Sequence, residues 1–160
     1  MNIKSILKDK KFWIVSSFVA FVSYKLYKKR KRKIFVSYHS KNDANYKNML
    51  MAWQKNKDFK FNFDDKSVGV SLDTTVNLEI EDGITKKLNE SNLILCIVGE
   101  KTHTRQWVDW ELQKAKELDR KIIVIKINNK YKMPSCLKKS NIPIIKKFEK
   151  ELIIEAIEKS

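Results

Sequence analysis

The stretch Asn92-Leu-Ile-Leu-Cys-Ile-Val98 decides the fold of this chain. After its first residue it is continuously apolar, which is typical of a central strand in a parallel sheet, because helices cover both faces of such a strand. Two other short runs, Lys33–Tyr38 and Lys121–Ile127, are rich in β-branched or aromatic residues and are predicted to be strands of the same sheet. Together the three runs indicate an α/β domain.

Segments with helical spacing of apolar residues alternate with these strands. Phe59–Phe63, in contrast, alternates apolar with polar residues and is predicted to be a half-exposed strand at an edge of the sheet. Helices are expected at residues 42–54, 75–89, 107–118 and 147–159, and a short last strand at residues 142–145. Asn42 or Asp43 is expected to cap the first helix. Short, right-handed crossovers then predict a doubly wound five-stranded parallel sheet, whose ligands bind beyond the carboxyl ends of the strands.

Residues 1–33 differ from the rest of the chain in charge and hydropathy. They carry eleven Lys and Arg and one acidic residue, which accounts for +10 of the net charge of +15, whereas the other 127 residues contribute +5. Within them, Phe12–Tyr24 is an uncharged run of thirteen residues with lysines on both sides. We expect two parts, with residues 1–32 forming an N-terminal hydrophobic helix and a polybasic linker, and residues 33–160 forming the folded domain.

The N-terminal helix is predicted to be a single-pass anchor in the cell membrane. Thirteen residues are short for the ~20 that span a bilayer, so the prediction requires the flanking lysines to extend to the headgroups. A signal peptide and a helix lying in the membrane surface are the alternatives. The basic run Lys28–Lys33 predicts a cytoplasmic folded domain and contact of residues 1–33 with membrane lipid. Nucleic acid is not expected as a partner, because most of the excess charge lies outside the folded domain.

The chain lacks the motifs of several common enzyme classes. It has no Walker loop, no Gly-x-Gly-x-x-Gly, no Gly-x-Ser-x-Gly and no zinc-binding motif. With two cysteines far apart and two histidines, neither a metal site nor a disulfide framework is expected. The first predicted strand ends in Tyr38-His39-Ser40 and the third in Val98-Gly99-Glu100, so the acidic residues of a response regulator are missing from both places.

The segment Arg105-Gln-Trp-Val-Asp-Trp-Glu-Leu112 combines a carboxylate and an indole at the start of a helix. Trp107 and Glu111 are four residues apart and therefore lie on one helix face, one turn from each other. At the mouth of a parallel sheet, such a pair suits the cleavage of a nucleotide sugar. The alternative is structural, since acidic residues in a first turn stabilise the helix dipole and a tryptophan can be part of the core.

Three segments resemble sequence blocks of TIR and TIR-like domains. Lys33–Ser40 resembles their opening strand, and Phe61–Ser67 resembles their second strand and the loop after it. Gly99–Leu112 resembles the segment in which TIR domains carry Trp-Cys-x-x-Glu-Leu, with Val108 in place of the cysteine. Its form Thr-x-x-Arg-x-Trp-Val-Asp-Trp-Glu is especially similar to the bacterial TIR-like domain of the Thoeris anti-phage sensor family, ThsB. The resemblance covers about residues 33–149 and implies a flavodoxin-like (TIR-like) fold.

The resemblance implies that the protein cleaves NAD⁺, with Glu111 as the essential carboxylate. NAD⁺ is then a substrate, and no cofactor is expected. In the Thoeris setting the product is an ADP-ribose-derived nucleotide signal, a cyclic ADP-ribose isomer or a related conjugate, that activates a downstream effector in anti-phage defence. A homo-oligomer is also expected, because TIR-like enzymes often assemble. The residues expected to hold NAD⁺ are polar and aromatic ones at or near the strand ends, namely Tyr38, His39, Ser40, Asp64, Arg105 and Trp107.

Three other functions stay open at this point. One is a non-enzymatic TIR-like adaptor that self-associates through the predicted loop Asp64–Asp73. Another is an enzyme similar to nucleoside deoxyribosyltransferases, which share the sheet type and a glutamate. The third is a lipid- or nucleic-acid-binding module that uses Lys28–Lys33.

Overall fold

The domain is built on five parallel strands. A computed structural model describes residues 32–56, 61–64, 78–138 and 140–160. In this part of the chain the strands lie in the order β2-β1-β3-β4-β5, and each neighbouring pair is parallel. The predicted doubly wound five-stranded sheet is therefore confirmed. The strands are β1 (Arg32–Ser37), β2 (Phe61–Asp64), β3 (Leu93–Val98), β4 (Lys121–Lys126) and β5 (Ile144–Ile145).

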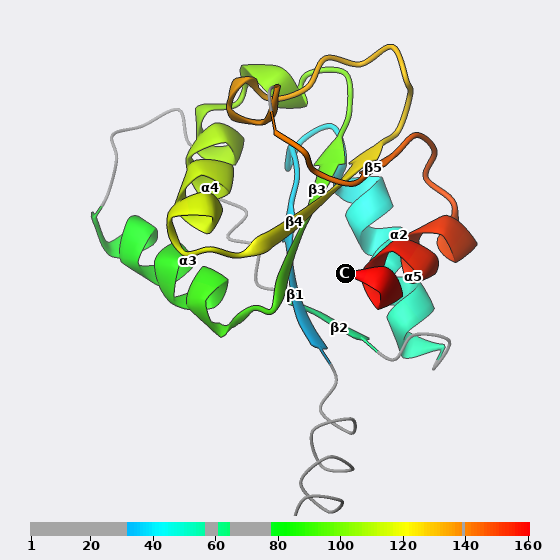
Figure 1. Cartoon of the computed structure of the whole chain (residues 1–160), viewed down its shortest axis with the longest axis horizontal. Coiled ribbons are helices and arrows are strands. Elements are labelled where there is room, and N and C mark those ends of the chain that lie inside the picture. Colours follow the sequence, from blue (N-terminus) through cyan, green and yellow to red (C-terminus); the bar gives the residue numbers. More distant parts are fainter. Residues whose placement is uncertain (1–31, 57–60, 65–77, 139) are drawn as a thin grey trace, which may run out of the picture. The chain divides into compact units, whose positions relative to one another are not determined.

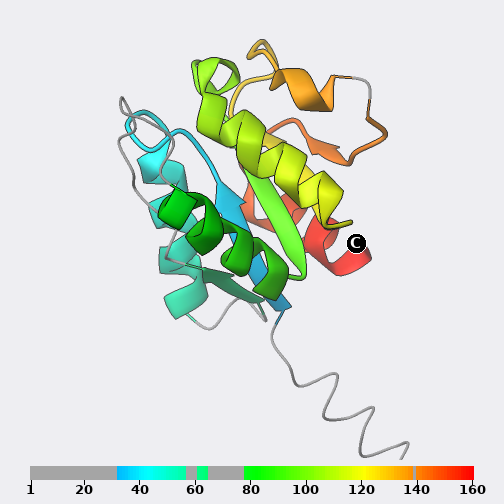
Figure 2. The same cartoon turned by 90° about the vertical axis from the view of Figure 1, so that its left-hand side faces the viewer.

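Helices cover both faces of the sheet (Figure 1). One pair, α2 and α5, packs on one face, and the other pair, α3 and α4, lies side by side on the opposite face (Figure 1, Figure 2). The described helices are α2 (Ala44–Lys55), α3 (Leu78–Glu90), α4 (Gln106–Glu117) and α5 (Lys150–Lys159), with two short 3₁₀ helices, η1 (Thr102–Thr104) and η2 (Ser135–Leu137).

All six residues of β3 are buried, because the strand faces a separate core on each side. Leu93, Leu95 and Ile97 belong to the core under α2 and α5, and the three residues between and after them belong to the core under α3 and α4. In β1, Ile34 and Val36 likewise enter the first core and Phe35 the second. Because side chains alternate along a strand, Ser37 follows Phe35 on the α3 and α4 face.

β2 lies at the edge of the sheet, as its alternating sequence predicts. Phe61 and Phe63 are buried in the core under α2 and α5, whereas Asn62 is exposed. The N–H of Phe63 donates a hydrogen bond of 2.7 Å to the side-chain oxygen of Gln54, near the end of α2. This contact ties the edge strand to the helix that precedes it.

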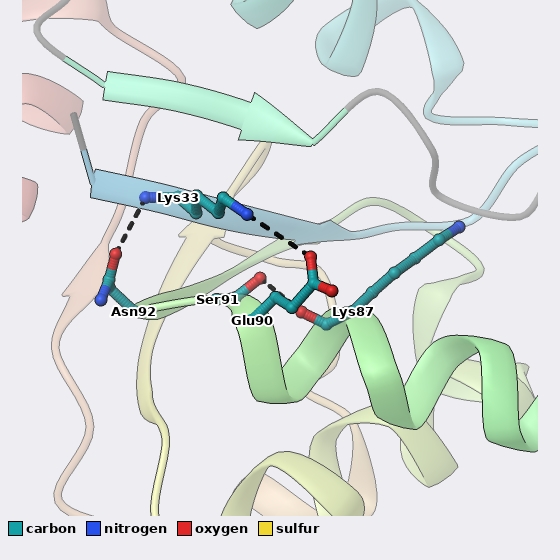
Figure 3. Close-up of polar contacts among 5 residues, drawn as sticks. All are labelled: Lys33, Lys87, Glu90, Ser91 and Asn92. Carbon is teal, nitrogen blue, oxygen red and sulfur yellow. Dashed lines mark hydrogen bonds and ion pairs between the residues drawn. The ribbon is translucent and has the colours of Figure 1, made fainter. Parts of the chain in front are cut away.

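Polar contacts at the amino end of the sheet set β1 beside β3 (Figure 3). The N–H of Lys33 donates to Oδ1 of Asn92 at 3.0 Å, and the N–H of Asn92 donates to the carbonyl of Lys33 at 2.8 Å. The Lys33 ammonium pairs with Glu90 at 3.4 Å, and the buried Ser91 hydroxyl donates to the carbonyl of Lys87 at 2.8 Å. The side chain of Lys87 extends away from this group (Figure 3).

The last helix begins later than the sequence predicts. The apolar spacing predicts a helix from Lys147, but α5 begins at Lys150 and the backbone of Glu149 is extended, with φ −123° and ψ 135°. The reason lies in Phe148, whose ring stacks on Trp53 at a centroid distance of 5.5 Å and meets the ring of Tyr46 at 4.8 Å. Packing of this ring on α2 takes precedence over one more turn of α5. The last strand is also shorter than predicted, and covers Ile144–Ile145 rather than residues 142–145.

The predicted membrane anchor falls on residues that the structure does not describe. These residues, 1–31, include the whole apolar run Phe12–Tyr24. Among the residues from Arg32 onward that are described, no helix has the length and apolar character needed to cross a bilayer. The anchor and the domain boundary after residue 32 stay predictions.

The first described residue, Arg32, belongs to the fold. Its guanidinium Nη1 donates to the carbonyl of Ile157 at 2.6 Å and to the hydroxyl of Ser160 at 3.1 Å, at the carboxyl end of α5. A cation in that place is stabilising, because the end of a helix carries partial negative charge and unpaired carbonyls. The first residue of β1 is thereby joined to the carboxyl end of α5.

A buried clasp joins the loops that follow β1 and β3. The hydroxyl of Thr102 donates to Oδ2 of Asp43 at 2.8 Å and accepts the N–H of Gly99, also at 2.8 Å. Asp43 is the N-cap residue of α2, one of the two positions expected, but its side chain makes no capping hydrogen bond to the helix. The clasp leaves no room at Gly99, because a Cβ built there would lie 2.0 Å from Oδ1 of Asp43.

Gly99→Ala is therefore expected to lower the free energy of unfolding by at least about 2 kcal/mol, because the added methyl group must displace a buried carboxylate. Urea unfolding measures the change. Gly83→Ala in α3 is the matched control, since its Cβ would meet nothing within 4 Å. That variant is expected to gain about 0.5–1 kcal/mol from helix propensity. Equal stabilities of the two variants would contradict the clasp.

Candidate functional site

Strand order reverses between β1 and β3, and the loops after these two strands diverge there. The loop of β1 leads to α2 on one face of the sheet, and the loop of β3 leads through η1 to α4 on the other face. Ligands of doubly wound sheets bind at this topological switch point, outside the carboxyl ends of the strands. Three polar contacts between described residues cross it. One of them is the Asp43–Thr102–Gly99 clasp, and the other two involve Glu111 and His39.

Glu111, the predicted catalytic residue, lies in the second turn of α4 beside the end of β1. Its Oε2 accepts a hydrogen bond of 2.6 Å from the hydroxyl of Ser37, the last residue of β1. The Ser37 side chain is buried, whereas Glu111 keeps partial contact with solvent. The bond therefore holds the carboxylate against the α3 and α4 face of the sheet, at its carboxyl end.

The environment of Glu111 favours its protonated form. Burial raises the pKa of the carboxyl group from 4.5 to about 7, while the Ser37 hydrogen bond and the positive charge of Lys87 lower it. Burial dominates because a carboxylate removed from water loses solvation that these two groups replace only in part. Glu111 thus changes charge near neutral pH, as a reactive carboxylate with a tuned pKa does.

The second contact joins two residues that the sequence also predicts for the site, His39 and Arg105. The Nε–H of Arg105 donates to Nε2 of His39 at 2.6 Å. His39 is buried and Arg105 is exposed at the start of α4. Burial, and then the charge of Arg105, lower the pKa of His39 below 6.5, against the raising effect of Asp43. A neutral imidazole has one acceptor nitrogen, so the N–H of Lys41, 3.2 Å from Nδ1, competes with Arg105 for it.

The other predicted site residues are more scattered. Trp107 is half-buried, packs on the core under α3 and α4, and meets the ring of Trp110 edge to face at 5.3 Å. Tyr38 packs against the core on the opposite face, under α2 and α5. Ser40 is half-buried in the loop after β1. Asp64 ends the neighbouring strand β2, opposite Phe35, and its side chain lies outside the described part of the structure.

The sequence prediction missed Ser37, Thr102 and the structural use of Asp43. The role of Ser37 could have been predicted from the sequence. It is a hydroxyl residue in the otherwise apolar run Ile34–Tyr38, and it lies two residues after Phe35, so both side chains point to the same face of the sheet. The Thr102 and Asp43 pairing could not have been predicted, because 59 residues separate the two in sequence. In the described part of the chain, His, Cys, Asp and Glu side chains form no group of three that could hold a metal ion.

The raised pKa of Glu111 has a consequence for stability. A carboxyl group with a raised folded-state pKa costs stability as pH rises from 4.5, and the cost is complete above pH 7, at about 3 kcal/mol. Glu111→Gln removes this cost and can still accept the Ser37 hydrogen bond. Its free energy of unfolding is therefore expected to rise relative to wild type between pH 4.5 and pH 8.

Urea unfolding across this pH range measures the difference. Glu158→Gln, at an exposed position of α5, is the control and is expected to differ from wild type by a constant amount. A pH-independent difference for Glu111→Gln would mean that the carboxyl group is solvated in the folded state as it is in the unfolded state.

Two of the solved structures similar to this chain are a CMP N-glycosidase and a set of TIR domains. The chain is similar to the CMP N-glycosidase BcmB of Clostridium botulinum, with 12% identity and a TM-score of 0.55 over 79% of this chain and 98% of that chain. It is also similar to the TIR domains of the activated Roq1 resistosome that recognises the pathogen effector XopQ, with 14% identity and a TM-score of 0.44 over 60% of this chain and 57% of that one. At such identities the likeness to BcmB shows the fold alone.

Sequence comparison gives the family. No curated protein sequence matches the chain. A family model described as "Thoeris protein ThsB, TIR-like domain" matches residues 35–132, which is more than half of the 160 residues. The matched region includes Ser37, His39, Arg105 and Glu111 and the buried clasp between the two loops. The chain therefore belongs to the family of the Thoeris protein ThsB, TIR-like domain.

Proposed function

We propose that this protein cleaves the bond between nicotinamide and ribose in NAD⁺, with Glu111 as the catalytic carboxylate. The observation that carries the proposal is the Glu111 carboxyl group itself, held by Ser37 at the carboxyl end of the sheet, where strand order reverses. The pKa of this group, raised by burial to about 7, further supports a reactive role.

The chemistry requires one carboxylate and no acid for the leaving group. Nicotinamide departs as a neutral base from a cationic ring, and the bonding electrons leave with its nitrogen. The ribose develops positive charge in an oxocarbenium-like transition state. An ionised Glu111 stabilises this charge, and more strongly in partly buried surroundings than in water. A water molecule or a nucleophile of the same dinucleotide then forms the new bond at the anomeric carbon.

Residues at the strand ends and at the start of α4 are assigned to the rest of the dinucleotide. Arg105 is the exposed cation at the start of α4, and together with His39 it is assigned to the pyrophosphate. Trp107, one turn before Glu111, is assigned to stacking on a ring of the substrate. Ser40 and Asp64 at neighbouring strand ends are assigned to polar contacts, and Tyr38 to a second aromatic contact despite its packing on the other core.

Family membership supports a role in anti-phage signalling. The product proposed here is an ADP-ribose-derived nucleotide, a cyclic ADP-ribose isomer or a related conjugate, that activates a downstream effector. NAD⁺ is the substrate and no cofactor takes part. A homo-oligomer and a single-pass membrane anchor in residues 1–32, with the TIR-like domain in the cytoplasm, complete the proposal.

A nucleoside N-glycosidase is the second candidate, because the fold that this chain shares with BcmB carries such an activity in that protein. That protein is a CMP N-glycosidase, and 98% of its chain is covered at a TM-score of 0.55. CMP is therefore assayed beside NAD⁺, together with nucleoside base exchange. A non-enzymatic adaptor that acts by self-association would turn over none of these substrates.

Glu111→Gln is expected to lower the rate of nicotinamide release at least about 1000-fold, because the neutral amide cannot stabilise the oxocarbenium charge. Release from NAD⁺ is measured by chromatography, with and without phage infection of the expressing cells. The control is Glu117→Gln, six residues along the same helix, whose carboxylate is exposed and pairs with Lys114 at 2.9 Å. The control is expected to keep wild-type turnover.

The alternatives give different results in the same assay. Wild-type turnover in Glu111→Gln would remove the catalytic assignment. Turnover of CMP without NAD⁺ would favour the nucleoside N-glycosidase. Absence of all turnover in infected and uninfected cells, together with self-association, would favour the adaptor.

Deletion of residues 1–31 is expected to release the protein from the membrane and to leave NAD⁺ turnover within about twofold of wild type. Arg32 is kept because its guanidinium holds the end of α5. Flotation of membranes and nicotinamide release from the same lysate measure the two properties. Membrane attachment of the shortened chain would contradict the anchor, and loss of turnover would contradict the independence of the domain.

A further inference from the structure

We propose that Ser37 is a positioning residue that holds the Glu111 carboxylate in its reactive, ionised form through the hydrogen bond from its buried hydroxyl. This inference rests on the catalytic role proposed for Glu111. The other members of the site keep their assignments, and Ser37 acts through Glu111 without contact with the substrate.

The place of Ser37 in the sheet is the first step of the argument. It is the last residue of β1 and pairs in register with Cys96 of β3, so it lies on an interior strand, at the carboxyl end of the sheet beside the switch point. Its side chain is 1% exposed and follows Phe35 on the face covered by α3 and α4. A hydroxyl in that apolar layer is costly unless it is hydrogen-bonded. The bond to Glu111 satisfies it.

The geometry of the bond is the second step. Ser37 Oγ and Glu111 Oε2 are 2.6 Å apart, which is the separation typical of a hydroxyl that donates to an ionised carboxylate. The donor is carried by a central strand rather than by a loop, so it cannot follow the carboxylate if α4 moves. A donor held on a strand thus orients the Glu111 carboxylate and stabilises its ionised form.

The groups around Glu111 show why such a donor is needed. Burial raises the pKa of Glu111 by more than the Ser37 hydrogen bond and the charge of Lys87 in α3 lower it. Cys96 of β3 is neutral, since burial first and the Glu111 charge second raise its pKa. His103 of η1 and Cys136 of η2 are the titratable groups of the two 3₁₀ helices packed on α4. β4 contributes the apolar residues Ile122 and Val124 to this core.

Two opposing requirements follow from these surroundings. A carboxylate that stabilises an oxocarbenium ion is most effective where water is scarce, but scarcity of water also favours its protonation. Ser37 meets both requirements. Its neutral hydroxyl stabilises the negative charge of Glu111 by a hydrogen bond, and no positive group has to pair with the carboxylate. The midpoint of the Glu111 titration consequently stays near neutral pH.

Titration of the full chain tests the inference. The Glu111 carboxyl carbon is followed by ¹³C NMR from pH 5 to pH 9 and is identified by its absence in Glu111→Gln. Ser37→Ala is expected to move the midpoint about one pH unit higher, the effect of losing one hydrogen bond to a charged group. Ser37→Thr keeps a hydroxyl and is expected to return the midpoint toward wild type.

Ser91→Ala is the matched control, since Ser91 is equally buried but stands at the amino end of β3 and donates to the carbonyl of Lys87 (Figure 3). Its midpoint for Glu111 is expected to equal that of wild type. The acidic limb of the pH profile for nicotinamide release from NAD⁺ is expected to move with the NMR midpoint in each variant.

The outcomes separate this inference from the proposed function. A Glu111 midpoint in Ser37→Ala at or below the wild-type value overturns the role of Ser37, whatever the activity. A higher midpoint in a protein that releases no nicotinamide supports the coupling of Ser37 to Glu111 and overturns the assigned reaction. A loss of activity at every pH without a change in midpoint would give Ser37 a structural role only.

Discussion

The burial of β3 on both faces is the constraint on which the rest of this structure depends. A strand with six buried residues needs helices on both sides, and parallel neighbours connected by crossovers supply them. The crossovers then leave in opposite directions from β1 and β3, which lie side by side. Polar residues that follow these two strands are thereby brought together at one edge of the sheet, although about 60 residues separate the strands in sequence.

Two carboxylates at that edge, those of Asp43 and Glu111, have different surroundings. Asp43 accepts the Thr102 hydroxyl within a clasp that also holds the N–H of Gly99, and so joins two loops. Glu111 receives the Ser37 hydroxyl but lies where burial raises its pKa to about 7. The first arrangement stabilises a connection, and the second leaves a group that changes charge near neutral pH. One fold thus holds the same functional group in two environments that favour different protonation behaviour.

Several predictions from sequence failed where a tertiary contact outweighed a local pattern. The apolar spacing predicts a helix from Lys147, but the ring of Phe148 packs on Tyr46 and Trp53 of α2, and the backbone of Glu149 after it is extended. Asp43 is of a residue type that often caps a helix through its side chain, but its carboxylate accepts the hydrogen bond of the Thr102 hydroxyl instead. In contrast, the alternation in Phe61–Phe63 correctly identified an edge strand. A strand that is buried on one face only has an apolar residue at every second position, and this pattern is visible in the sequence.

The sequence by itself determined the class of fold, the number of strands and their order along the chain, and the block around Glu111 that resembles the family. These properties follow from hydrophobic periodicity and from residues close together along the chain. Only the tertiary structure decided which groups meet at the switch point: Ser37 with Glu111, His39 with Arg105, and Asp43 with Thr102. Each of these pairs is separated by 59 to 74 residues, and no local pattern specifies a partner at that range. The ionisation of Glu111 belongs to the same category, because it depends on the buried volume that only the packed helices and sheet create.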